Sequence, residues 1–231
     1  MNKSSGYKAL MTLLGLIIAI AMICAALYSL GVLDLRHKKE VTLEMDDFGN
    51  RFTGVLLNGV MSGEGDIIYK NGDRFIGNFV NGVYSGEGRF ISYQGWKYEG
   101  IFQNGQPHGH GTFTATNGSV FTGNFDTGRI SGSGVFTSID GWIYDGMWDQ
   151  GRQLGQGTFA FLDGSTYEGE FVDGVASGVG IYTDINGWRY EGGFLQGLFE
   201  GEGSLTFPNG EVMTGLWSAG NWQIPTEEDG S

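Results

Sequence analysis

The sequence has little cysteine, proline or histidine, and few basic residues, and these shortages exclude several classes of protein. Among 231 residues there are one cysteine (Cys24), three prolines and three histidines. A single cysteine excludes both a disulfide framework and a cysteine-based metal site. Thirteen Lys and Arg stand against 26 Asp and Glu, which gives a formal charge of −13. Because an anionic chain repels phosphate groups, nucleic acid is not an expected partner.

Glycine, by contrast, is abundant, with 43 residues. Glycine-rich chains are often flexible linkers or disordered segments. Here 40% of the residues are hydrophobic and 14% are aromatic, and disordered segments do not normally carry so many. The glycines must therefore belong to an ordered structure.

The N-terminal part of the chain contains an apolar run without charge at residues 9–33. Roughly 20 apolar residues suffice to cross a bilayer, so the run predicts a transmembrane helix after a short tail, residues 1–8. A cleaved signal peptide remains an alternative, because small residues stand at Cys24 and Ala26 near the end of the run. Lys and Arg are nearly balanced on its two sides, so the orientation of the span stays open.

From residue 49 onward the sequence repeats every 23 residues. Glycine occupies the first, sixth and eleventh positions of eight successive units, and the fifteenth and seventeenth positions of seven. These positions account for 38 of the 43 glycines. Aromatic residues keep the same register at the fourth, eighth and nineteenth positions, as Tyr144, Trp148 and Phe159 do in the fifth unit. The pattern predicts a chain of similar units that stack on their neighbours.

Each unit is predicted to contain two strands. Side chains alternate along a strand, so the fourth, sixth and eighth positions place an aromatic residue, a glycine and an aromatic residue on one face. The second strand presents two glycines and an aromatic residue. In an antiparallel pair, a ring of one strand can then lie over a glycine of the next. Pairs such as Asn71-Gly72 and Asn81-Gly82 predict the turns between strands, so about sixteen strands are expected.

The motif Tyr-x-Gly-x-Phe-x-x-Gly-x-x-x-Gly-x-Gly, seen at Tyr98–Gly111 and Tyr167–Gly180, resembles the MORN (membrane occupation and recognition nexus) repeat. The resemblance covers eight units in residues 49–220, of which the first and last depart most from the motif. It implies an all-β fold: an elongated, twisted antiparallel β-meander of eight hairpin repeats. It also implies scaffolding or membrane-associated roles without catalysis by the repeats. Some family members bind phospholipids and many self-associate.

The sequence therefore predicts five parts along the chain. They are a short N-terminal tail (1–8), a transmembrane helix (9–33), a basic linker with a capping strand (34–48), a MORN-repeat domain (49–220) and an acidic C-terminal tail (221–231).

No catalytic residue, cofactor or metal site is predicted. Asp145 stands at the fifth position, which faces away from the rings and is mostly polar in other units, so it is expected to be solvated. His108 and His110 form a His-x-His pair that could share a strand face. Two ligands without a third make a weak site, however. The Gly-Ser stretches lack the Lys-Ser pair and the helix of a phosphate-binding loop.

Three tryptophans stand at a position that the repeat motif leaves unspecified. Trp96, Trp142 and Trp188 occupy the second position of the third, fifth and seventh units, where the even-numbered units carry Asp, Ser or Glu. They either fill an alternating layer of the core or anchor a partner, because tryptophan is enriched at interface hot spots. These three are the candidate partner-binding residues.

Together, these features predict a single-pass membrane protein whose acidic β-ribbon is a non-catalytic scaffold. It would tether or organise an unidentified protein partner at the bilayer, and a homo-oligomer joined through exposed ribbon ends is also possible. The alternative is a membrane-lipid-recognition module made by the repeats. Residues 41–231 carry a formal charge of −16, which opposes binding to anionic lipids.

Overall fold

The computed structural model of the protein describes residues 38–43 and 49–224, and within them every regular element is a β-strand. The predicted transmembrane helix and most of the C-terminal tail lie outside these residues. The strands are β1 (Lys38–Leu43), β2 (Arg51–Leu57), β3 (Val60–Ile68), β4 (Arg74–Val80), β5 (Val83–Ile91), β6 (Lys97–Gln103), β7 (Gln106–Thr114), β8 (Val120–Asp126), β9 (Arg129–Thr137), β10 (Ile143–Asp149), β11 (Arg152–Ala160), β12 (Thr166–Val172), β13 (Val175–Thr183), β14 (Arg189–Leu195), β15 (Leu198–Thr206), β16 (Val212–Ser218) and β17 (Asn221–Trp222).

The chain divides into two compact units. The first joins Met1–Lys39 to Leu56–Val60, and the second joins Glu40–Val55 to Met61–Ser231. Little of the first unit is described. The second unit holds most of the sheet.

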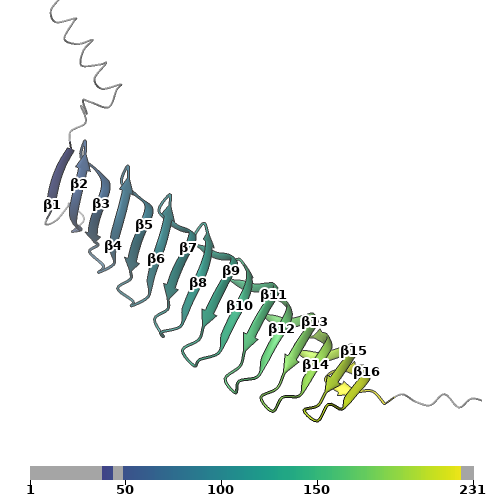
Figure 1. Ribbon diagram of the computed structural model, residues 1–231. Helices are drawn as coiled ribbons and strands as arrows, with labels where there is room; N and C mark the ends of the chain where they lie inside the picture. Colours follow the sequence, from purple (N-terminus) through teal and green to yellow (C-terminus); the bar gives the residue numbers. More distant parts are fainter. Residues whose placement is uncertain (1–37, 44–48, 225–231) are drawn as a thin grey trace, which may run out of the picture. The chain divides into compact units, whose positions relative to one another are not determined.

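Strands β2 to β17 follow one another in a single antiparallel sheet, in the order of the sequence (Figure 1). Equivalent residues face each other in successive pairs: Gly77 lies opposite Gly88 in β4 and β5, and Gly88 lies opposite Gly100 in β5 and β6. The same register recurs through β15 and β16. The predicted meander of sixteen strands is confirmed.

The two strands of one repeat are joined by a turn of two residues. Both have positive φ, 51° at Asn81 and 80° at Gly82, which is the type I′ geometry that matches the twist of the flanking strands. The turns between repeats differ. Gly95 alone has positive φ in its turn, at 98°, and its N–H donates to the carbonyl oxygen of Ser92 at 2.9 Å. The Asn-Gly pairs thus predicted both kinds of turn but did not distinguish them.

The core is built by aromatic rings that lie on glycines. The ring of Phe75, which is completely buried, covers Gly77 of its own strand and Gly88 of the next. A Cβ atom on Gly88 would lie 2.6 Å from Cζ of Phe75, and one on Gly77 would lie 2.6 Å from Cα of Gly88. Any larger residue would have to displace the ring or the neighbouring strand. The predicted placement of rings over glycines is confirmed.

These rings also contact one another in a continuous row. Phe75 meets Phe79 of its own repeat at a centroid distance of 5.2 Å and Phe102 of the next repeat at 5.0 Å, both edge to face. Each such pair contributes about 0.5–1.5 kcal/mol beyond the area it buries. The fourth-position ring of every repeat from the second to the seventh is held in this way. The core therefore runs through the sheet from repeat to repeat.

In four repeats the fourth-position ring is a tyrosine whose hydroxyl donates to a backbone carbonyl three residues further on. Tyr98, Tyr144, Tyr167 and Tyr190 make these bonds at 3.0, 3.0, 2.9 and 3.1 Å. Burial raises the pKa of all four, to about 12 for Tyr98, Tyr144 and Tyr167. The folded chain therefore holds these protons at a pH where the unfolded chain, with tyrosine pKa values of about 10, has released them.

We expect Gly180→Ala to lower the free energy of unfolding by about 2–3 kcal/mol, because its Cβ would lie 2.6 Å from the Tyr167 ring. Val179→Ala is the matched control: this neighbour is 66% exposed, and its replacement should cost less than about 0.5 kcal/mol. Denaturant titration of both variants measures the difference. Equal losses would contradict the packing of the ring on glycine.

We also expect the unfolding free energy to be constant with pH up to about 10 and to fall as pH rises to about 12, because the pKa of the buried tyrosines is raised. The triple variant Tyr98→Phe, Tyr144→Phe and Tyr167→Phe should lose much of this fall, and phenylalanine already fills the position in other repeats. Denaturant titrations at several pH values test this. An unchanged alkaline fall in the variant would show that other groups cause it.

Candidate functional site

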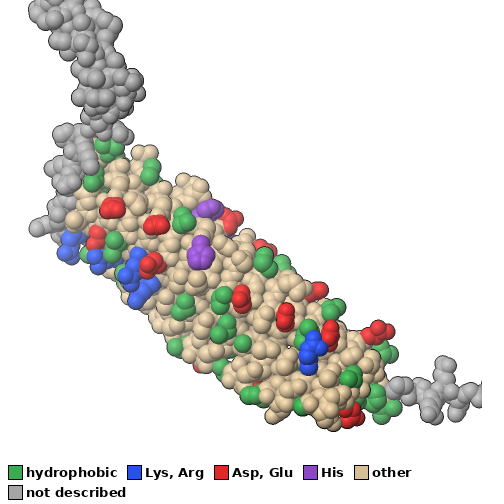
Figure 2. Space-filling model, in the orientation of Figure 1, with side chains coloured by type: hydrophobic (Ala, Val, Ile, Leu, Met, Phe, Trp, Pro, Cys, Tyr) green, Lys and Arg blue, Asp and Glu red, His purple; other side chains and the backbone are tan. Residues whose placement is uncertain are grey.

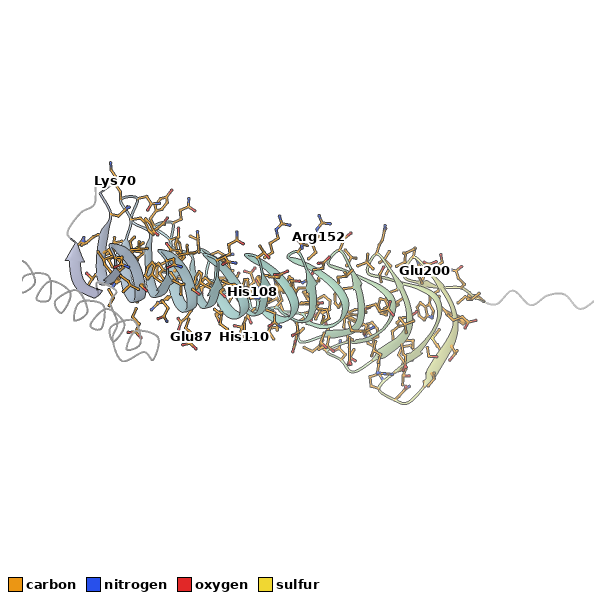
Figure 3. The ribbon with its side chains drawn as sticks, turned by 90° about the horizontal axis from the view of Figure 1, so that it is seen from above. Lys70, Glu87, His108, His110, Arg152 and Glu200 are labelled. Carbon is orange, nitrogen blue, oxygen red and sulfur yellow. The ribbon has the colours of Figure 1, made fainter. Side chains whose placement is uncertain are left out.

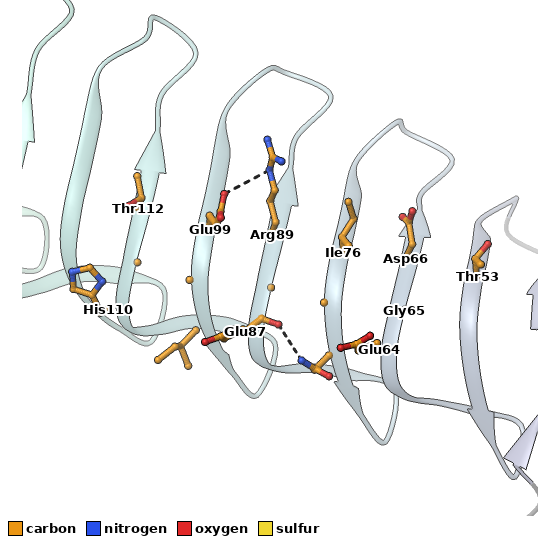
Figure 4. Close-up of a pocket in the computed structure, with 16 residues that line it drawn as sticks. Thr53, Glu64, Gly65, Asp66, Ile76, Glu87, Arg89, Glu99, His110 and Thr112 are labelled. Atoms are coloured by element: carbon orange, nitrogen blue, oxygen red, sulfur yellow. Dashed lines mark hydrogen bonds and ion pairs between the residues drawn. The ribbon is translucent and has the colours of Figure 1, made fainter. Parts of the chain in front are cut away.

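The described sheet carries several hollows, and two of them are candidate sites. The first, here called the outer groove, has a volume of about 1110 Å³ and crosses the strands from β2 to β7 on the side away from the rings (Figure 4). Glycines of the sixth and seventeenth positions lie between two rows of side chains. One row holds Thr53, Asp66, Ile76, Arg89, Glu99 and Thr112, and the other holds Glu64, Asn78, Glu87, Ile101 and His110.

Three of the five charged side chains that line the outer groove form ion pairs. Arg74 donates from Nε and Nη2 to the two carboxylate oxygens of Asp66, at 2.9 and 2.6 Å. Arg89 Nε lies 3.9 Å from Glu99 Oε2. Glu87 and His110 project from one side of the sheet (Figure 3). The lining thus holds four carboxylates and one guanidinium group, which disfavours an anionic ligand.

The residues tested for chemistry occupy ordinary positions. Asp145 is exposed. Nδ1 of His108 lies 3.5 Å from a carboxylate oxygen of Asp126, whereas His110 lines the outer groove. Within residues 38–43 and 49–224, no group of three or more His, Cys, Asp or Glu side chains is arranged to hold a metal ion.

The second hollow, here called the apolar pocket, lies on the aromatic side of the sheet between β11 and β15. Its volume is about 480 Å³. Aromatic and small residues make up its entire wall: Phe159, Phe161, Tyr167, Phe171, Gly174, Val175, Ala176, Tyr182, Trp188, Phe194, Gly197 and Phe199.

The thirteenth position of the repeat explains why a pocket forms here. In the second repeat Tyr84 stacks on Phe75, and in the seventh Phe199 stacks on Tyr190, both at a centroid distance of 3.8 Å with nearly parallel rings. The sixth repeat has Ala176 at this position. The methyl group of Ala176 thus takes the place of a whole aromatic ring. The space that the ring fills in the second and seventh repeats becomes part of the apolar pocket.

The three predicted partner-binding tryptophans all lie on the aromatic side and are half-buried. Trp96 stacks on Phe90 at 5.0 Å, and Trp142 stacks on Phe159 at 5.1 Å, each with an interplanar angle of 18°. Trp188 lies in the wall of the apolar pocket. The structure thus gives them packing contacts and leaves part of each ring accessible. Their role in binding a partner stays a prediction.

Polar residues at this position can make a hydrogen bond that tryptophan cannot. In two even-numbered repeats the polar side chain accepts from a backbone N–H in the following turn. Asp73 Oδ1 accepts from Tyr93 N–H at 2.8 Å, and Ser119 Oγ accepts from Ile139 N–H at 3.0 Å. Tryptophan has no acceptor, and contributes stacking instead. The surface pattern at this position therefore recurs every two repeats.

Charge divides the sheet into two unlike halves. Residues 49–117 hold five acidic and five basic side chains, whereas residues 118–224 hold thirteen acidic and three basic, a net charge of −10. On the face seen in Figure 2, most Lys and Arg side chains lie toward the N-terminal end of the sheet. The outer groove lies in the neutral half and the apolar pocket in the acidic half.

Trp188 was predicted from the sequence as a partner-binding residue, but neither the outer groove nor the apolar pocket was predicted. The signal for the apolar pocket was present in the thirteenth position, where Ala176 contrasts with Tyr84 and Phe199. The outer groove has no comparable signal, because its lining follows from a face that is polar in most repeats.

The model of the MORN repeat family matches seven consecutive repeats in residues 52–212. The chain belongs to this family. The eighth predicted unit, which contains Met213 and Trp217, is not matched by the family model, although its strand β16 continues the sheet. MORN repeats form modules for protein interaction or membrane association.

No curated protein was found to match the sequence. Among solved structures, the SAS-4 (dCPAP) TCP domain of Drosophila melanogaster is similar with 14% identity and a TM-score of 0.44, over 80% of this chain and 93% of that one. A CPAP G-box domain is similar with 11% identity and a TM-score of 0.42, over 79% and 100%. Likenesses this weak carry no information about function.

The described part of the chain contains no helix that is long and apolar enough to cross a membrane. The predicted span, residues 9–33, lies outside that part.

Trp142→Ala should lower the free energy of unfolding by about 2 kcal/mol, because it removes a half-buried ring that stacks on its neighbours. Met147→Ala is the control: Met147 lies in strand β10, which follows Trp142, on the face away from the rings and is 46% exposed, so its replacement should cost less than about 0.5 kcal/mol. Denaturant titration compares them. A smaller loss for the tryptophan variant would mean that its stacking contributes little.

Proposed function

We propose that the protein is a membrane-anchored, non-catalytic scaffold. Residues 9–33 would hold the chain at the bilayer, and the repeats would bind a protein partner there. The family supports the second part, since MORN repeats are modules for protein interaction or membrane association. Catalysis is not proposed, because most described carboxylates face solvent, and half-buried ones such as Asp66, Asp73, Asp184 and Glu200 pair with a basic side chain or accept from backbone or amide N–H groups.

The observation that carries the proposal is the arrangement of Trp96, Trp142 and Trp188. All three are partly exposed on one side of the sheet, at intervals of two repeats, and each rests on rings that the core holds in place. Fixed, partly exposed aromatic side chains are typical of interface hot spots, because they lose little conformational freedom on binding. The spacing suits a partner that runs across several repeats.

The test is partner capture by cross-linking in native membranes, with the full-length chain and two triple variants. One replaces Trp96, Trp142 and Trp188 with Ser, the residue that Ser119 and Ser165 place at the same position. The control replaces Ile101, Met147 and Val179 of the opposite face, which are 42–66% exposed, with Ser.

We expect the tryptophan variant to capture the partner at least tenfold less than wild type, and the control to capture it normally. Circular dichroism first confirms that both variants are folded. Loss of the partner only in the control would move the binding surface to the opposite face.

Lipid recognition is a second candidate, favoured by a row of exposed aliphatic side chains in the turns between repeats. Ile139, Leu162 and Ile185 occur in three successive turns and are 60, 65 and 61% exposed. The net charge of −10 in this half opposes anionic headgroups. Any such contact would therefore be with neutral lipids.

Flotation of residues 41–231 with vesicles separates the two functions, once circular dichroism shows that this segment is folded. The scaffold proposal predicts no flotation with phosphatidylcholine or phosphatidylserine vesicles at low salt. Flotation with phosphatidylcholine that is lost on replacing Ile139, Leu162 and Ile185 with Ser would establish lipid recognition instead.

A further inference from the structure

We propose that the apolar pocket binds an aromatic side chain carried by a basic segment of a partner protein. The inference rests on the proposed scaffold function and names the chemistry of the partner and the place where it docks.

The protein itself shows what kind of group fits above Ala176. The eighth and thirteenth positions face each other in the second, sixth and seventh repeats alike: Phe79 with Tyr84, Phe171 with Ala176, and Phe194 with Phe199. The backbone is thus in the same register in all three. In two of them the space above the fourth-position ring holds a stacked aromatic ring. In the sixth that space is left to an incoming side chain.

The walls of the apolar pocket favour a ring over an aliphatic side chain. Tyr182, Trp188 and Phe199 line the pocket and are half-buried. Tyr182 contacts Trp188 at 5.1 Å and Phe199 at 6.3 Å. A ring inserted among them gains edge-to-face and stacked contacts, each of about 0.5–1.5 kcal/mol, that a branched aliphatic side chain lacks.

Charge indicates what should flank the ring. The pocket lies within residues 118–224, whose net charge is −10. Lys or Arg on either side of the inserted ring would be attracted by this field, and cations also bind the faces of Trp and Tyr. The C-terminal residues 225–231 of this chain suit the pocket poorly, because they contain three acidic residues and no aromatic one. A separate partner fits better.

The test uses the full-length protein and three synthetic peptides with blocked ends: Lys-Lys-Phe-Lys-Lys, Lys-Lys-Leu-Lys-Lys and Glu-Glu-Phe-Glu-Glu. NMR of ¹³C-labelled alanine methyl groups follows binding at Ala176 directly. We expect the basic phenylalanine peptide to shift the Ala176 methyl signal saturably, the leucine peptide to bind at least fivefold more weakly, and the acidic peptide not to bind. No saturable shift up to millimolar peptide, or equal binding of phenylalanine and leucine peptides, would overturn the proposal.

Ala176→Phe supplies the ring from within the chain, as Tyr84 and Phe199 do in their repeats. This variant should bind the basic phenylalanine peptide at least tenfold more weakly in calorimetric titration and should melt at the same temperature as wild type or higher. Val179→Phe, which adds a ring to the same strand on the opposite face, is the matched control and should bind normally. Unchanged binding in Ala176→Phe would overturn the proposal.

If Ala176→Phe should fail to fold, Tyr84→Ala provides an independent test. It removes the stacked ring of the second repeat, which lies outside the apolar pocket, and opens the corresponding space above Phe75. A second peptide site should then appear, doubling the stoichiometry, and its absence would count against ring insertion. Self-association of the wild type that Ala176→Phe abolishes would identify a second copy of the chain as the occupant and would overturn the partner assignment.

The scaffold function can survive the failure of this proposal. A partner that is captured in membranes by Ala176→Phe but lost in the tryptophan triple variant would support the scaffold and exclude the pocket.

Discussion

The contact between an aromatic ring and a bare glycine backbone is the interaction on which the structure depends. Phe75 covers Gly77 and Gly88 so closely that a single added Cβ atom has no room. The close approach lets rings of successive repeats meet edge to face, so burial and ring contacts reinforce each other. A thin single sheet has no second layer to cover its core. Here the rings serve as that layer, and the glycines give them space.

The same constraint limits where variation can occur. The core requires the glycines and the rings, and the type I′ turn requires the glycine at the eleventh position. The turn is imposed even on residues that disfavour positive φ, such as Thr127, Gln150 and Ala219, at 50°, 50° and 49°. What remains free is the outer face and a few positions beside the rings. The second and thirteenth positions are two at which the side chain differs among the repeats.

Much of the fold could be predicted from the sequence because the glycines and the rings recur at a constant spacing. The 23-residue spacing, the glycines and the rings predicted the strands, the meander and the ring-on-glycine packing. The sites could not be read in the same way. The packing of Trp188 against Tyr182 depends on twist and side-chain rotation, which spacing does not contain. The apolar pocket depends on a residue that is small relative to its counterparts, and Ala176 is unremarkable until Tyr84 and Phe199 are seen stacked.

The thirteenth position has one more consequence. A surface of eight near-copies would let a partner bind equally well after sliding by one or more repeats. This position is occupied by a different residue in every repeat: Met61, Tyr84, Pro107, Ile130, Gln153, Ala176, Phe199 and Trp222. The side chain at the thirteenth position thus gives each repeat a different local shape beside an otherwise uniform row of rings. The sheet therefore combines a periodic backbone with a surface on which each repeat can be distinguished from the others.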